Sequence, residues 1–166
     1  MRLSVIAVLA VVTCWLAGAA HAQDGVNVNT ANQQSLLNIA QSAGHSAQPS
    51  NIGGDGVPGI EVRTQDGITF YAVGTACEQG GCRGIKLMAR HQPAGTVSYG
   101  KINTINREMS PLKLWYTPEV VILERYLILD GGVSPAHLAF EMRIFPTYVS
   151  LVTEQLNQAE GSSQAQ

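Results

Sequence analysis

The chain has 166 residues, of which 45% are hydrophobic and 13% are charged, and its formal net charge is −2 at pH 7. This length fits one domain with a substantial core. The small negative charge argues against the basic footprint of a protein that binds nucleic acid or an anionic membrane surface, so we expect neither as a partner.

The N-terminus is typical of a cleavable secretory signal peptide. Arg2 gives a positive start, residues 5–17 are largely apolar, and small residues flank His21 at the peptidase site. Cleavage after Ala22 predicts a periplasmic or secreted protein. The apolar run is shorter than the roughly 20 residues that a membrane helix needs, so no span is expected in the mature chain. A retained anchor, or lipidation at Cys14, is the less favoured alternative.

The mature chain is expected to begin with a loose segment, a helix and a loop. Residues 23–29 are mostly polar and predict the loose lead-in. Residues 31–42 follow Thr30, a candidate N-cap, and group their apolar side chains at helical spacing, which predicts a short amphipathic helix. Residues 45–57 are rich in Ser, Gly, Pro, Asn and Asp, which are typical of turns, and predict a loop.

Alternating apolar and polar residues then predict a meander of three strands. Residues 60–64 and 68–73 flank Asp66-Gly67, a two-residue turn signal, and are expected to form a hairpin. Residues 84–90 alternate again and form the third expected strand.

Two cysteines remain after cleavage, Cys77 and Cys82. An even number of cysteines in an exported chain favours a disulfide, and the short glycine-containing loop between them lets the two residues approach each other at a hairpin end. Zinc binding with His45 or His91, and a catalytic dithiol, are weaker alternatives because Cys-x4-Cys has neither the usual zinc-site nor the usual redox spacing.

The second half predicts a helix and two antiparallel strands. Thr96 is a candidate cap for a helix over residues 97–109, and residues 112–116 predict a strand. Residues 120–129 form the next strand, and apolar side chains occur on both of its alternating faces. This pattern is typical of a strand that is covered on both sides.

Ser134-Pro135 marks the start of the last helix, because a capping hydroxyl precedes a ring that is fixed at helical φ. Pro146 should kink this helix, and residues 159–166 have the composition of a disordered tail. The predicted order is αβββαββα over residues 23–158, an α+β domain with a twisted antiparallel sheet of about five strands. One apolar stripe is expected to pack the last helix on the sheet: Leu138, Met142, Phe145, Val149, Val152 and Leu156.

Four polar residues are candidates for either binding or structural roles. Asn103 and Asn106 lie on one side of the predicted second helix, where their amides could contact a ligand or bond the nearby backbone; we favour the backbone. Glu124 and Arg125 interrupt an apolar strand and should point to opposite faces. Each could face a partner, but pairing with charges on adjacent strands is the more frequent arrangement.

The residues resemble those of the YbjN-like family, bacterial proteins described as sensory transduction regulators. Residues 102–107, Ile-Asn-Thr-Ile-Asn-Arg, are similar to the family's helix motif Ile/Val-Asn-x-Trp-Asn-Arg, and residues 120–133 to its strand and Gly-Gly-Val turn. Residues 67–77 and 82–87 resemble its central strands. The likeness extends over roughly residues 36–156.

This resemblance implies a fold like that of type III secretion chaperones, with helices packed on a twisted antiparallel sheet, in proteins that bind other proteins. It implies no activity, cofactor or catalytic residue. Ile105 stands where the family usually has an aromatic residue, which suggests a repacked core, and the export signal argues against a cytoplasmic regulatory role.

No hydrolase, metalloprotease, P-loop or dinucleotide motif occurs in the sequence. We therefore expect a non-enzymatic exported protein without metal or cofactor. Its expected role is to bind a protein, as a chaperone-like or sensory accessory domain, and a homodimer is a candidate assembly. The competing hypothesis is a protein that binds a small molecule or envelope component in a pocket between sheet and helices.

Overall fold

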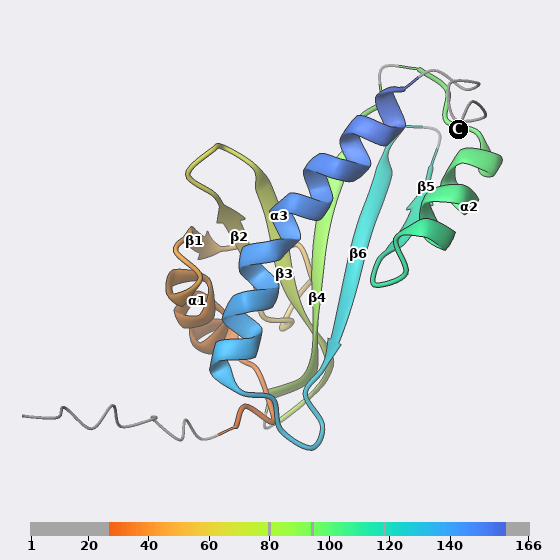
Figure 1. The fold of residues 1–166 in the computed structure, drawn as a ribbon. Coiled ribbons are helices and arrows are strands. Elements are labelled where there is room, and N and C mark those ends of the chain that lie inside the picture. The colour runs from red at the N-terminus through yellow and green to blue at the C-terminus, as the bar shows by residue number, and fades with distance from the viewer. Residues whose placement is uncertain (1–26, 80, 94, 118, 159–166) are drawn as a thin grey trace, which may run out of the picture.

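A computed structural model describes residues 27–158 of the chain, apart from residues 80, 94 and 118. The expected signal peptide and C-terminal tail lie outside these residues. The described part is an α+β domain in which three helices pack on a six-stranded antiparallel sheet of order β1-β2-β3-β4-β6-β5 (Figure 1). The elements are α1 (Gln33–Ser42), β1 (Ser46–Pro49), β2 (Gly59–Arg63), β3 (Thr69–Glu78), β4 (Gly81–His91), α2 (Tyr99–Glu108), β5 (Lys113–Tyr116), β6 (Val121–Ile128) and α3 (Pro135–Asn157).

The prediction of an antiparallel α+β domain is confirmed, but the sheet has one more strand than expected. Part of the segment predicted as a loop, residues 45–57, forms β1, which pairs with β2 through Ala47 opposite Val62. β1 is only four residues long and mostly exposed, and it ends at Pro49. A short edge strand buries too little apolar surface to impose alternation on its sequence, so its composition resembles that of a turn.

Two helices begin slightly later than predicted because other residues cap them. α1 is capped by Asn32, whose side chain accepts from the Ser35 amide at 2.9 Å while the Ser35 hydroxyl accepts from the Asn32 amide at 2.8 Å. This reciprocal arrangement replaces the expected cap, Thr30. In α2 the cap is Ser98, and not the predicted Thr96.

Of the loose lead-in predicted for residues 23–29, residues 23–26 lie outside the described residues, and the described residues before α1 are held by backbone pairing. Val28 and Val133 exchange backbone hydrogen bonds of 2.8 and 3.1 Å, and Ala31 and Cys82 exchange two of 2.8 Å. The segment therefore pairs with the first residues of β4. At this level of the sheet β6 has already ended. This pairing involves backbone groups only, so side-chain polarity gives no sign of it.

The predicted β2–β3 hairpin is confirmed. Gly67 has φ +89°, a conformation that a residue with Cβ rarely adopts, and the Thr64 amide donates to the Ile68 carbonyl at 3.0 Å across the turn. The last helix is also confirmed, with Ser134 as N-cap and Pro135 in the first turn. It continues through Pro146 to Asn157 as a single helix.

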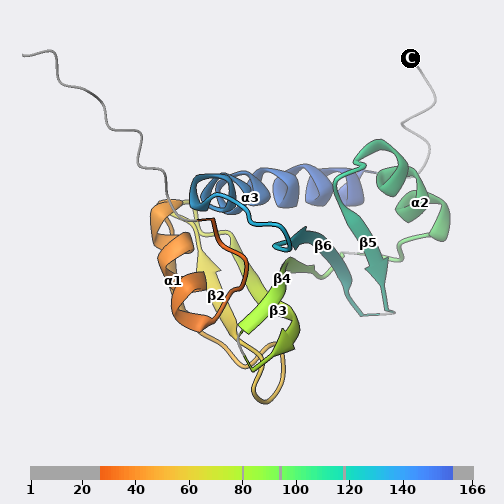
Figure 2. The ribbon, with the colours of Figure 1, turned by 90° about the horizontal axis from the view of Figure 1, so that it is seen from below.

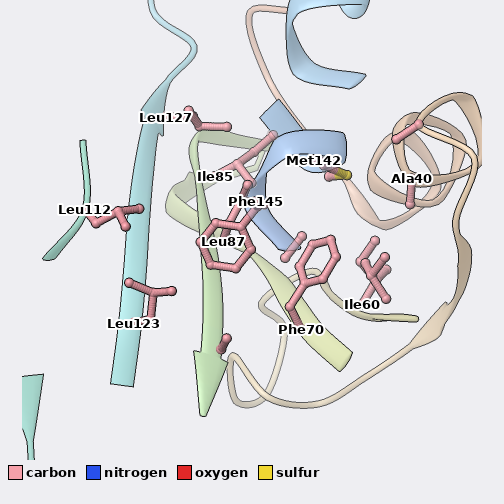
Figure 3. Close-up of a cluster of buried hydrophobic side chains, with 14 of the residues drawn as sticks. Ala40, Ile60, Phe70, Ile85, Leu87, Leu112, Leu123, Leu127, Met142 and Phe145 are labelled. Carbon is pink, nitrogen blue, oxygen red and sulfur yellow. The ribbon is translucent and has the colours of Figure 1, made fainter. Parts of the chain in front are cut away.

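The hydrophobic core lies between the sheet and the helices (Figure 3). The rings of Phe70 from β3 and Phe145 from α3 are fully buried, with their centroids 5.3 Å apart. Leu87 of β4 belongs to the same cluster. The predicted apolar stripe of α3 faces this core, with Val149 only partly buried.

Candidate functional site

One side of the sheet carries apolar side chains that no helix of the described residues covers. α3 lies along the opposite side of β4 and β6, and α1 and α2 flank it on that same side (Figure 2). We call the uncovered side the open face. Register and strand alternation assign to it Glu61, Arg63, Tyr71, Lys86, Met88, Arg90, Lys113, Trp115, Ile122, Glu124, Tyr126 and Ile128.

This finding corrects the prediction that the strand over residues 120–129 is covered on both sides. On the core side of β6, Leu123 and Leu127 are buried as expected. On the open face, Tyr126 and Ile128 are 53% and 62% exposed, and Trp115 on the neighbouring strand is 40% exposed. Ile122, on the same side at the start of β6, is 4% exposed, so the prediction is wrong for Tyr126 and Ile128 in the second half of the strand.

Gly84 creates the space in which Tyr126 lies. A Cβ atom at Gly84 would stand 2.5 Å from the Tyr126 hydroxyl oxygen and 2.8 Å from its Cζ, so a side chain there would displace the ring. An aromatic ring over a strand glycine covers backbone that would otherwise face water. Gly84 thus provides space for the Tyr126 side chain.

A row of charges crosses the middle of the open face. Glu124 on β6 lies between two lysines of adjacent strands, 3.2 Å from the Lys86 Nζ and 4.0 Å from the Lys113 Nζ. The Glu124 side chain is only 12% exposed, whereas that of Lys113 is 73% exposed. The carboxylate is therefore engaged, and the lysines retain donors that face the solvent.

Arg125 points to the core side, as expected for the neighbour of Glu124, but its partner comes from α3 and not from a strand. Its guanidinium donates to both carboxylate oxygens of Glu141, at 2.5 and 2.6 Å, and to the Pro111 carbonyl at 3.1 Å. Glu141 is 3% exposed, and His137 Nε2 lies 3.3 Å from it, one turn earlier in α3. Hydrogen bonding to Glu141 raises the pKa of Arg125, and the contact is a two-point hydrogen bond that ties α3 to β6.

The two asparagines have different surroundings. The Asn106 side chain bonds both backbone groups of Leu114 on β5: Nδ2 donates to the carbonyl at 3.0 Å, and Oδ1 accepts from the amide at 2.6 Å. It therefore occupies the position of a neighbouring strand along the outer edge of β5. Asn103 is exposed.

Cys77 and Cys82 form a disulfide between directly paired residues of β3 and β4. Cys82 is buried and Cys77 is exposed. A Cβ at Gly74 would overlap the Cys82 sulfur, so the glycine provides the space that the disulfide occupies. The bond closes the β3–β4 hairpin beside the segment that precedes α1.

A hollow of about 610 Å³ lies where the end of α1 and the β2–β3 turn meet the middle of α3. His45 is at its rim, and its Nε2 lies 3.2 Å from the Met142 carbonyl. Pro146 has no N–H to bond that carbonyl from within the helix. Since a carbonyl only accepts, His45 donates to it and replaces the missing helical hydrogen bond.

Among the residues described, no group of three or more His, Cys, Asp or Glu side chains is arranged to hold a metal ion. In the same residues no helix is both long and apolar enough to cross a membrane. Comparisons with protein-family models, curated proteins and solved structures found no match. The open face and the hollow are therefore the features from which we argue function.

Sequence reasoning names Glu124 but misses the apolar residues around it. The signal is present, since apolar side chains at both parities of residues 120–129 require cover on both sides of the strand. The pattern does not say which chain supplies that cover. A second covering layer would need another amphipathic element, and the predicted order contains only three helices, all of which the core uses.

Proposed function

We propose that this protein is an exported, non-enzymatic binding domain of the YbjN-like type, with a chaperone-like or sensory accessory role. It recognises another protein through the open face. The observation that carries this proposal is the exposure of Trp115, Tyr126 and Ile128 on a sheet side that the helices leave free. Exposed aromatic and aliphatic groups that cluster on a surface mark interaction sites more often than isolated ones do.

The position of these residues also supports binding by a face. The side chains come from the adjacent strands β5 and β6, so the sheet holds them at fixed spacing and little entropy is lost when a partner docks. The hydroxyl end of Tyr126 lies next to Gly84. A rigid aromatic group with a polar tip is the kind of residue that dominates binding energy in protein interfaces.

The proposal is tested by placing a photocrosslinking amino acid at Tyr126 in the full chain, expressed with its own leader. The matched control carries the same group at Gln41, which is exposed on α1 and lies off the open face. We expect one reproducible protein adduct from position 126 that is absent from position 41 and lost on Trp115→Ser. Adducts of equal yield at both positions, or none from position 126, would contradict the proposal, and self-adducts alone would identify a homodimer.

The alternative function, binding of a small molecule or envelope component, is favoured by the hollow at His45. Its lining includes the hydroxyl of Thr64, the carboxylate of Asp66 and the guanidinium of Arg143. The apolar side chain of Ile68 lies in the same lining. Thermal-shift screening against carboxylated and sugar-like compounds tests it. A stabilising compound whose effect is lost on Arg143→Gln would support the hollow as a ligand site, and screening without such a compound would leave the open face as the proposed site.

A further inference from the structure

The open face has apolar side chains at two ends, each beside a basic residue, and an acidic residue between the ends. Trp115 lies opposite Ile122 at one end, and Tyr126 and Ile128 lie at the other end. Ile122 and Tyr126 are four residues apart in β6, which corresponds to about 13 Å along an extended strand. Glu124 and Lys113 lie between these two ends, whereas Lys86 pairs directly with Tyr126 and Arg90 with Ile122.

Positive charge dominates this face, although the whole chain has a net charge of −2. Two of its basic side chains flank Glu124, and the other two stand on β2 and β4. The face carries the basic residues Arg63, Lys86, Arg90 and Lys113 and the acidic residues Glu61 and Glu124. A second copy that docked by the same face would bring like charges together, so charge complementarity selects an acidic partner.

The charge pattern also distinguishes among acidic partners. Glu61 and Glu124 interrupt the basic residues, and Glu124 lies between Lys86 and Lys113. A polymer with one negative charge in every unit, such as a nucleic acid or an anionic polysaccharide, would place some of its charges against these carboxylates. A polypeptide can place carboxylates opposite the lysines and apolar side chains at the two ends.

We propose that the open face binds an acidic polypeptide segment of a partner protein. Its carboxylates pair with Lys86 and Lys113, and its apolar side chains pack on Trp115 at one end and on Tyr126 and Ile128 at the other. This inference rests on the proposed function, which requires a protein partner but specifies no charge.

The test uses two synthetic peptides that share the same aromatic and aliphatic residues and carry either Glu or Lys at every charged position. Binding to the mature protein is measured by fluorescence anisotropy at low and at high salt. We expect the Glu peptide to bind about 10-fold more tightly at low salt and the difference to shrink at high salt. Replacing both Lys86 and Lys113 by Gln should weaken the Glu peptide about 3- to 10-fold, since each exposed charge pair contributes little.

Two control variants separate charge from apolar contact. Lys101→Gln removes a lysine of α2, outside the open face, and should leave both affinities unchanged. Tyr126→Ser should weaken both peptides by a similar factor.

Equal affinities for the two peptides, or tighter binding of the Lys peptide, would overturn the proposal that the partner segment is acidic. If Tyr126→Ser weakened peptide binding in that case, the proposed function would still stand. Tighter binding of dextran sulfate or of anionic lipid vesicles than of the Glu peptide would also overturn it. Failure of both peptides while the in-cell adduct at position 126 persists would refute the acidic segment alone. Failure of peptides and adduct together would refute the proposed function as well.

Discussion

The hydrogen bond from His45 to α3 leads to a sharp prediction about stability. Replacing His45 by Phe keeps a ring near Phe70, with which His45 makes an edge contact at a centroid distance of 5.9 Å, but removes the donor to the Met142 carbonyl. Because Pro146 has no N–H, His45 is the hydrogen-bond partner of this carbonyl in the native chain. The His45→Phe variant leaves the carbonyl without that partner.

The expected cost follows from the position of the carbonyl. Met142 is buried, and an unsatisfied buried acceptor costs about 1 to 3 kcal/mol. Because His45 is only partly buried, water has partial access, and we expect a loss of about 1 to 2 kcal/mol in the free energy of unfolding. In a Pro146→Ala background, the alanine backbone supplies the helical N–H, and the cost of His45→Phe should fall below about 0.5 kcal/mol.

The measurement is a double-mutant cycle from urea unfolding followed by circular dichroism, with the slopes of the transitions compared to verify that two-state behaviour is retained. His91→Phe is the matched control, because no hydrogen-bond partner of its Nε2 occurs in the described structure. It should cost the same in both backgrounds. If the cost of His45→Phe is also the same in both, within about 0.5 kcal/mol, the role assigned to His45 is wrong.

Three further predictions concern stability. Arg125→Met should cost about 3 to 5 kcal/mol because it leaves Glu141 buried without its partner, and adding Glu141→Leu should recover most of that loss in chemical denaturation; a double variant as unstable as the single one would contradict the reasoning. Replacing Cys77 and Cys82 by Ala should lower the free energy of unfolding by about 2 kcal/mol, measured beside the native protein with and without reductant. Asn106→Leu should cost about 1 to 3 kcal/mol because two backbone groups of Leu114 lose their partners, whereas Asn103→Ala should change stability by less than about 0.5 kcal/mol. Equal effects of the two asparagine changes would refute the role given to Asn106.

The parts of the fold that could be predicted are those whose signals lie close together in sequence. Asp66-Gly67 forms its turn within four residues, and Ser134-Pro135 starts α3 by local backbone chemistry. The apolar stripe of α3 repeats over its whole length. Each of these features depends on residues that are close together in the chain.

The features that escape prediction depend on contacts between distant segments. Arg125 and Glu141 are 16 residues apart, and nothing in either local sequence links a strand arginine to a helix carboxylate. Asn106 acts on β5 through one backbone pair, which leaves no pattern in composition. The open face escapes prediction for a different reason. Residues 120–129 carry apolar side chains on both sides of the strand, but the sequence does not say whether the group that covers the second side belongs to the same chain.

The way in which the sheet ends bears on how this protein behaves when it is concentrated. At one edge the Asn106 amide bonds both backbone groups of Leu114 in the middle of β5, and at the other edge Pro49 of β1 offers no N–H. Growth of the sheet by addition of strands from other copies, the route to cross-β fibres, is therefore opposed at both ends. The face and the edges therefore differ in what they offer: the open face presents side chains to a partner, whereas the edges offer an incoming strand fewer free backbone groups.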